Sequence, residues 1–417
     1  MNTVQQSGVA EQTVAVSATN PRGFNLRTMG FALFGFCLVL VIVAYAFTRP
    51  LEDFVAYWTA AHLLAAGHNP YSLGEIFRFQ QGLGWREPIP LVALNPPWTL
   101  PLFSPIGLTQ SYPIAWLVWV MVMTFAIAFA SKMLMDLYFR DLRLAEISDR
   151  TIYRCMFALT FYPVLLSLKF AQTVPLVLLG SAAFLFYSEK GRPILAGILF
   201  GLTAVKPNLV YLVWLALLLK SVHERRWKTL VSAVGVIAVL MGIALVLDHH
   251  VISQYRALAS SPLPRVLMPG IAGAVRTLFG GRNVFWLQFV PPFAGLAWFL
   301  WYWRKYREHW SWTERMPALV TASLLTTSWG YMFDQTLLAI PIIAVAGLHA
   351  NKFGRLSRNL VIIYTALNVS LILLAMAASP WGYVPAPILI AFLLNREARG
   401  RNAFSSDVQL TYVGSQS

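Results

Sequence analysis

The chain has 417 residues, of which 58% are hydrophobic and only 12% are charged, and its formal net charge is +15. Soluble domains contain roughly 25% charged residues, so this composition excludes an ordinary water-soluble protein and calls for a lipid environment. The two cysteines, Cys37 and Cys155, both fall inside apolar runs, which is unlike a disulfide framework.

The distribution of the basic residues indicates membrane topology rather than nucleic-acid binding. If the N-terminus is cytoplasmic, about 23 of the 32 Lys and Arg residues lie in segments on the inner side of the membrane and about 9 lie on the outer side. This is the bias of the positive-inside rule. We therefore predict membrane lipid as the surroundings and no nucleic-acid partner.

Apolar runs of helical length separated by short polar hinges predict an all-α integral membrane protein with about 12 transmembrane helices. The expected spans are 29–48, 112–137, 151–168, 171–188, 193–206, 208–221, 229–247, 284–303, 316–332, 335–349, 359–378 and 384–395. We read 29–48 as an uncleaved signal anchor after a disordered cytoplasmic leader, 1–28. The polytopic domain is then 29–395, and 396–417 is a cytoplasmic tail.

Two outer segments, 49–111 and 248–283, are long enough to carry function. The first begins with a predicted helix between Pro50 and Gly67, which are typical start and stop residues. Its apolar stripe comprises Phe54, Trp58, Ala61 and Ala65. A neighbouring face carries Asp53, Tyr57 and Leu64. The pattern predicts a helix that lies at the outer membrane interface instead of crossing the membrane.

The stretch from Leu94 to Leu108 is hydrophobic but interrupted by prolines, which predicts a bent or re-entrant segment. Polar residues also gather at the outer ends of later spans. They are Lys206 before Pro207, the pair Asp334 and Gln335, and the pair Lys169 and Gln172. The predicted topology brings all of them to one side of the membrane.

Several short motifs follow one another in a recognisable order along most of the chain. They are Asp53-Phe54-x-x-Tyr57-Trp58-x-Ala60-Ala61, Gly67-x-x-Pro70-Tyr71, Asn95-Pro96-Pro97, Gln172, Gly191-Arg192-x-x-x-Ala196-Gly197, Gly201-Leu202 and Lys206-Pro207. This ordered set resembles the GT-C glycosyltransferases, specifically the PimE-like family of polyprenyl-phosphate-mannose-dependent α-mannosyltransferases. Members of that family often carry a histidine where this chain reads Phe333-Asp334-Gln335.

The resemblance implies a GT-C-like bundle, a lipid-linked sugar donor, a lipid or glycan acceptor, and transfer with inversion. It implies that Asp53 is the catalytic base, and it adds Asn95 and Gln172 to the substrate-binding residues. The expected location is a bacterial plasma membrane with the active site on the outer side. Mannose is the expected sugar, with arabinofuranose, another pentose or glucose as alternatives.

The chemistry can also be argued from the residues. Glycosyl transfer in one step needs a base near the acceptor hydroxyl and a cation for the departing phosphate, roles that suit Asp53 and Lys206. Tyr57, Trp58, Asp334 and Gln335 are candidate substrate contacts. Each of these residues also has a purely structural explanation. Asp53 could complement the helix dipole, Lys206 could snorkel to the membrane interface, and Tyr57 and Trp58 could belong to an aromatic belt.

No cofactor and no metal are expected, because the pair His249-His250 lacks further ligands at site-forming spacing. Arginines in the second outer segment are weaker candidates for phosphate contact; they are Arg256, Arg265, Arg276 and Arg282. A transporter or lipid flippase is the alternative function. It would place ionisable groups near the membrane midplane in repeated, broken helices, which this sequence does not suggest.

Overall fold

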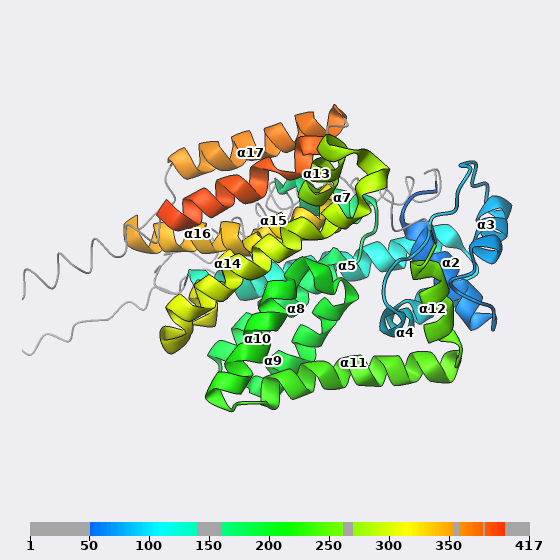
Figure 1. Ribbon diagram of the computed structural model, residues 1–417, viewed down its shortest axis with the longest axis horizontal. Helices are drawn as coiled ribbons and strands as arrows, with labels where there is room; N and C mark the ends of the chain where they lie inside the picture. The colour runs from blue at the N-terminus through cyan, green and yellow to red at the C-terminus, as the bar shows by residue number, and fades with distance from the viewer. Residues whose placement is uncertain (1–50, 140–159, 262–269, 354–357, 378–379, 397–417) are drawn as a thin grey trace, which may run out of the picture. The chain divides into compact units, whose positions relative to one another are not determined.

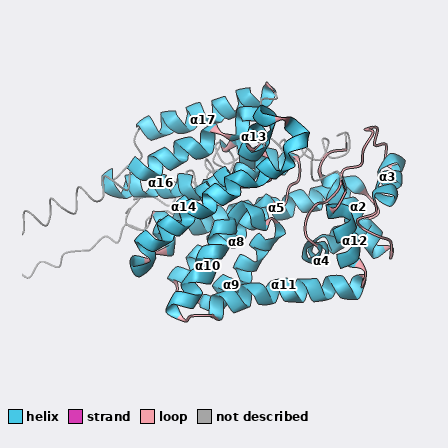
Figure 2. Cartoon of the chain, viewed as in Figure 1, coloured by secondary structure: helices cyan, strands magenta, loops and turns pink. Residues whose placement is uncertain are grey.

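The computed structural model describes residues 51–139, 160–261, 270–353, 358–377 and 380–396. Within these ranges the chain is helical and contains no β-strand (Figures 1 and 2). Contacts divide the chain into two units, Met1–Arg49 and Pro50–Ser417, and the helices described belong to the second unit. The predicted leader, the span 29–48, both cysteines and residues 397–417 of the tail lie outside the described residues.

The α-helices are α2 Phe54–Ala65, α3 Leu73–Gly82, α4 Leu100–Gly107, α5 Tyr112–Tyr138, α7 Tyr162–Lys169, α8 Val174–Glu189, α9 Pro193–Phe200, α10 Tyr211–Glu224, α11 Lys228–Leu247, α12 Val251–Ala259, α13 Ile271–Phe279, α14 Val290–Tyr306, α15 Trp312–Thr326, α16 Ala339–Phe353 and α17 Arg358–Met376. A further apolar helix is Pro385–Arg396. The 3₁₀ helices are η1 Pro97–Thr99, η2 Gly201–Val205, η3 Pro207–Val210, η5 Gly281–Phe289, η6 Arg307–His309, η7 Met332–Leu338 and η8 Pro380–Tyr383.

Prolines explain many of the helix starts. Helices α5, α7, α8, α9 and α14 all carry proline in their first two positions, where the missing N–H would have no partner in the helix. Pro207 has the opposite effect on the preceding turn, because η2 ends just before it and η3 begins at it. The chain is therefore divided into many short helices.

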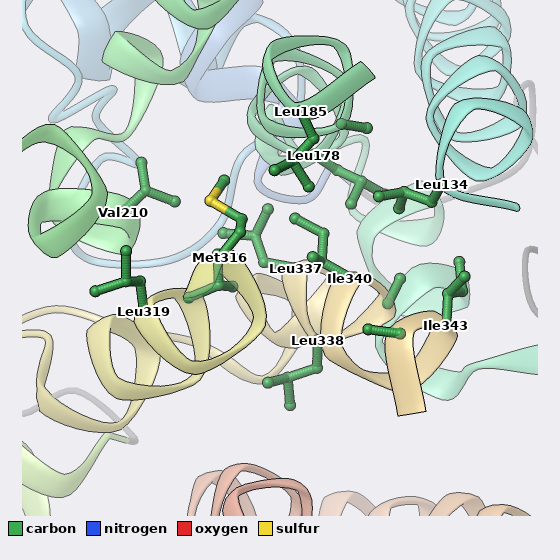
Figure 3. Packing of buried hydrophobic residues seen from close by; sticks show 14 of the residues in the cluster. Leu134, Leu178, Leu185, Val210, Met316, Leu319, Leu337, Leu338, Ile340 and Ile343 are labelled. Carbon is green, nitrogen blue, oxygen red and sulfur yellow. The ribbon is translucent and has the colours of Figure 1, made fainter. Parts of the chain in front are cut away.

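The core lies among α5, α8, α10, α15 and α16, whose facing side chains are apolar (Figure 3). Helix α8 is apolar around its whole circumference, and ten of its residues are buried. Such helices belong inside a bundle. Close crossings use small residues: a Cβ on Gly197 of α9 would collide with the Thr229 carbonyl oxygen of α11. Small residues at crossings are typical of helix packing in membranes.

Five helical segments among the described residues are long and apolar enough to cross a membrane: Tyr112–Tyr138, Lys228–Leu247, Asn283–His309, Met332–Asn351 and Arg358–Met376. The protein is thus an all-α membrane protein. Five is fewer than the predicted 12, because 29–48 and residues 151–159 lie outside the described residues and because prolines and tight turns leave several other expected spans as shorter helices. The expected span 193–206, for example, consists of α9 followed by η2.

The prediction of an amphipathic α2 with one apolar stripe is wrong. Ten of its twelve residues are buried, including Tyr57 and Leu64 on the supposedly different face, whereas Ala65 is exposed. The cause is that α2 packs against α3, α4 and α5 on several sides. Its crossing with α4 is so close that a Cβ on Gly107 would meet the Ala61 backbone. The bend predicted for 94–108 takes the form of η1 followed by α4.

Candidate active site

Asp53 stands immediately before α2, yet its side chain does not cap the helix. Its Oδ2 instead accepts a hydrogen bond of 2.8 Å from Gln172 Nε2. Burial is the main reason that the pKa of the Asp53 carboxyl lies above its ordinary value. The charge of Lys206 and the Gln172 hydrogen bond lower this pKa, while the Glu52 and Asp334 carboxylates raise it. The environment therefore favours proton uptake by Asp53.

Gln172 is held by the way α7 ends. The Gln172 N–H bonds to the Ser167 carbonyl at 2.8 Å, and the Ala171 N–H bonds to the Leu168 carbonyl at 3.0 Å. Ala171 between them has a left-handed φ of 47°. These are the features of a Schellman-type helix end. The Ala171 carbonyl also accepts a bond of 3.0 Å from Trp119 Nε1, which anchors the turn to α5.

Lys206 occupies the break between η2 and η3. Two side chains from the first outer segment fix this break through its backbone. Asn95 Nδ2 donates to the Val205 carbonyl at 2.9 Å, and Trp98 Nε1 donates to the Ala204 carbonyl at 2.9 Å. The Lys206 side chain is only 15% exposed, so its ammonium group lies among Gln172 and Asp334 instead of snorkelling to a surface.

Asp334 lies in the first turn of η7 and is almost fully buried. Its Oδ1 lies 2.9 Å from Lys206 Nζ, and its Oδ2 accepts a bond of 2.9 Å from the Tyr331 N–H. Lys206 Nζ also donates to Gln172 Oε1 at 3.1 Å. A continuous chain of contacts thus runs from Asp53 through Gln172 and Lys206 to Asp334.

No group of three or more His, Cys, Asp or Glu residues that could hold a metal ion occurs in the described part of the chain. The profile of Glycosyltransferase family 87 matches residues 93–330, which is more than half of the chain. The chain belongs to glycosyltransferase family 87. No curated protein and no solved structure matches it.

Membership of family 87 makes the protein a membrane glycosyltransferase, which acts on a sugar donor and an acceptor. It confirms the glycosyltransferase prediction, but at a coarser level than the PimE-like family. The match includes Asn95, Gln172 and Lys206, while Asp53 and Asp334 lie outside it.

The structure sorts the other predicted site residues of this glycosyltransferase. Tyr57 belongs to the cluster, since its hydroxyl donates to Gln172 Oε1 at 2.9 Å. Trp58 turns away, because its Nε1 donates to Thr109 Oγ1 at 3.0 Å. Gln335 also turns away and donates to the Tyr383 carbonyl at 2.8 Å.

The outer arginines do not join the cluster as a group. Arg256 is exposed on α12. Arg276 is fully buried and donates to Gln288 Oε1 at 2.9 Å. Arg265 lies outside the described residues, as does the side chain of Arg282.

Two aromatic residues of the cluster were missed by sequence reasoning. The Lys206 ammonium lies 4.8 Å from the ring centre of Phe333, and Tyr331 stacks on Phe333 at 5.0 Å. Tyr331 is 38% exposed. The signal available in the sequence was the aromatic residues around Asp334, in Tyr331-Met332-Phe333. An exposed aromatic face beside a cation is suited to contact a sugar ring.

Proposed function

We propose that this glycosyltransferase moves mannose from a polyprenyl-phosphate donor to a lipid or glycan acceptor at the outer face of a bacterial plasma membrane. The observation that carries the proposal is the joining of Asp53 and Lys206 through one amide. Gln172 lies 2.8 Å from the Asp53 carboxylate and 3.1 Å from the Lys206 ammonium. A base and a cation are therefore held in one small, partly buried space.

In the proposed step, an acceptor hydroxyl oxygen attacks the anomeric carbon while the bond from that carbon to the phosphate oxygen breaks. The hydroxyl proton passes to Asp53, and the electron pair leaves with the phosphate, whose growing charge faces Lys206. Attack opposite the leaving group inverts the anomeric centre. Phosphate is already a good leaving group, so we propose that neither a general acid nor a divalent metal is needed.

Mannose and the polyprenyl tail of the donor are supported by the sequence resemblance to the PimE-like family. Tyr331, which is partly exposed and stacks on the buried Phe333 ring beside Lys206, offers an aromatic surface that suits a hexose. Family membership favours an enzyme over a transporter or flippase. Arabinofuranose and glucose donors are the comparisons that the experiment must include.

For the membrane arrangement, we propose about twelve crossings, with both termini in the cytoplasm and 29–395 as the catalytic membrane domain. Short helices that follow one another, such as α9 and η2, would together complete a crossing. Residues 1–28 form the proposed leader and 396–417 the proposed tail. Residues 49–111 and 248–283 form the proposed outer segments, and α2 belongs to the first.

The transfer reaction is tested with purified protein, a membrane lipid extract as acceptor, and short-chain polyprenyl-phosphate donors that carry radiolabelled mannose, arabinofuranose or glucose. We expect label to pass from the mannose donor to a new lipid or glycan product, together with release of polyprenyl phosphate. Transfer from one of the other two donors alone would replace mannose with that sugar. No transfer from any donor would contradict the proposed function.

The outer location is tested separately by cysteine labelling in intact cells, in a variant without Cys37 and Cys155. Gln81 on α3 and Arg226 after α10 are both exposed, so cysteines placed there are accessible reporters. We expect an impermeant maleimide to label position 81 in intact cells and position 226 only after permeabilisation. The opposite pattern would invert the topology and move the site to the cytoplasmic face.

A further inference from the structure

We propose that Gln172 is a positioning residue that assigns distinct roles to the two oxygens of Asp53 and links this carboxylate to Lys206. The inference rests on the proposed function, in which Asp53 is the base and Lys206 binds phosphate. It replaces the predicted substrate contact of Gln172 with an indirect role. It also explains the position of Tyr57.

The chemistry of its partners fixes the orientation of the Gln172 amide. Lys206 Nζ can only donate, and it lies 3.1 Å from Oε1. The Tyr57 hydroxyl donates to the same oxygen at 2.9 Å. Burial raises the pKa of Tyr57, so its hydroxyl keeps its proton. A flipped amide would put an N–H₂ group against the ammonium and would lose the bond to Asp53. The N–H₂ group must therefore face Asp53 Oδ2.

The location of Gln172 also prevents direct participation in the reaction. Its side chain is 2% exposed, and its backbone is held by the helix end at α7. Gln172 therefore presents almost no surface to a substrate. It acts through Asp53 and Lys206.

Occupation of Oδ2 leaves Oδ1 for the acceptor hydroxyl. Within the described part of the chain, Oδ1 has no hydrogen-bond partner. A donor to the carboxylate stabilises its ionised form, which opposes the effect of burial. The other groups whose charges act on Asp53 are Glu52, Lys206 and Asp334. Gln172 is the neutral group that directly contacts Asp53.

The decisive variant is Gln172→Glu, which keeps the shape and the contacts to Lys206 and Tyr57 but places a carboxylate against Asp53. Two facing carboxylates retain a proton, so the base form of Asp53 appears only at higher pH. We expect the acid limb of kcat/KM, measured with the polyprenyl-phosphate mannose donor, to move up by about one pH unit or more. Gln172→Ala should move it in the same direction by less, and Tyr57→Phe least.

Gln81→Glu is the matched control, since it makes the same change on the exposed surface of α3. It should leave the pH profile unchanged. If Gln172→Glu also keeps the wild-type profile while the wild type transfers sugar, the positioning role is wrong and the proposed function stands.

A readout without substrate separates the two proposals. The melting temperature of Gln172→Glu should fall more steeply between about pH 5 and pH 8 than that of the wild type, because the proton shared in the folded state is lost as pH rises. Adding Asp53→Asn should restore the shallower dependence. If this coupling is found but the wild type transfers no sugar, the contact stands and the proposed function fails. A uniform loss at every pH, not rescued by Asp53→Asn, would overturn the positioning role.

Discussion

Asp53 and Asp334 both stand at the start of a helix and both face Lys206, yet their surroundings differ. Both oxygens of Asp334 have a partner. One pairs with Lys206, and the other caps the turn by accepting a hydrogen bond from the Tyr331 N–H. The Asp53 side chain does not cap α2, and among the described residues its one side-chain hydrogen bond comes from Gln172. Asp53 is half-buried, and this burial raises the pKa of its carboxyl above the ordinary value.

The difference shows how one site can hold two carboxylates with separate tasks. A carboxylate that is ion-paired and capping is engaged on both oxygens and acts as an anchor. One that is buried with a single neutral donor retains an oxygen for chemistry and a stronger affinity for protons. On this comparison we propose that Asp53 is the reactive group and that Asp334 holds Lys206 in place.

Asp53→Asn should give the largest effect. It keeps the size of the side chain but removes proton acceptance, so turnover should fall about 10²- to 10⁴-fold. Because the folded-state pKa of Asp53 is raised, the ionised form lowers stability at pH 7, and the melting temperature should rise or stay unchanged. Initial rates of sugar transfer and thermal denaturation in detergent check both halves. Near-normal transfer by a folded variant would make Asp334 the next carboxylate to examine.

Lys206→Ala should come next, with a loss of about 10²- to 10³-fold whatever acceptor is supplied, because the leaving phosphate loses its cation. Lys169→Ala is the matched control, since Lys169 is half exposed and lies 3.8 Å from Glu52. Transfer rates with two different acceptors measure the effect. A loss that appears with one acceptor only would move Lys206 from the donor to the acceptor.

Asp334→Asn should act mainly on stability. It leaves Lys206 without its anionic partner and weakens the cap at η7, which should cost about 1–3 kcal/mol. The expected readout is a lower melting temperature, with a smaller loss of turnover than for Asp53→Asn. A greater loss of turnover than Asp53→Asn, in a variant that melts like the wild type, would reverse the assigned roles.

The pH profile of kcat/KM should show a smaller effect, which comes from the raised pKa of Asp53. The kcat/KM value should fall as pH drops through the raised pKa of Asp53, so the acid limb should lie above the ordinary range of an aspartate. Rates between about pH 4 and pH 8 measure it. An acid limb at the ordinary aspartate value would assign the base to a more solvated group.

Removal of divalent metal should have no effect on rate, because the proposed counter-charge for phosphate is Lys206. Transfer rates before and after EDTA, with magnesium or manganese added back, provide the measurement. Loss and recovery of activity would instead make Asp53 and Asp334 candidate metal ligands.

Several of the site residues predicted from the sequence are joined in one network of contacts. Asp53, Tyr57, Gln172, Lys206 and Asp334 all meet, since each lies near a helix end where a polar side chain interrupts an apolar pattern. Trp58 and Gln335 bond to other parts of the chain, which periodicity does not reveal because it does not show which local partner satisfies a buried donor.

The fold class could be predicted from the amino-acid composition, but the lengths and packing of the individual helices could not. An all-α membrane protein follows from the apolar runs, but their division into short helices depends on proline positions and on tertiary packing. The burial of α2 on several sides could not be read from its own sequence. It depends on Gly107, which is 46 residues after Ala61 and allows α4 to approach.

The left-handed backbone at Ala171 has a consequence for how this chain can vary. Its methyl group is fully buried, and its φ of 47° already disfavours branched side chains. Random mutagenesis followed by selection for sugar transfer should recover glycine there more often than any larger residue. A valine or leucine at 171 would rebuild the α7 turn and move the neighbouring amide. The set of residues tolerated at position 171 therefore indicates how precisely the neighbouring amide must be placed for sugar transfer.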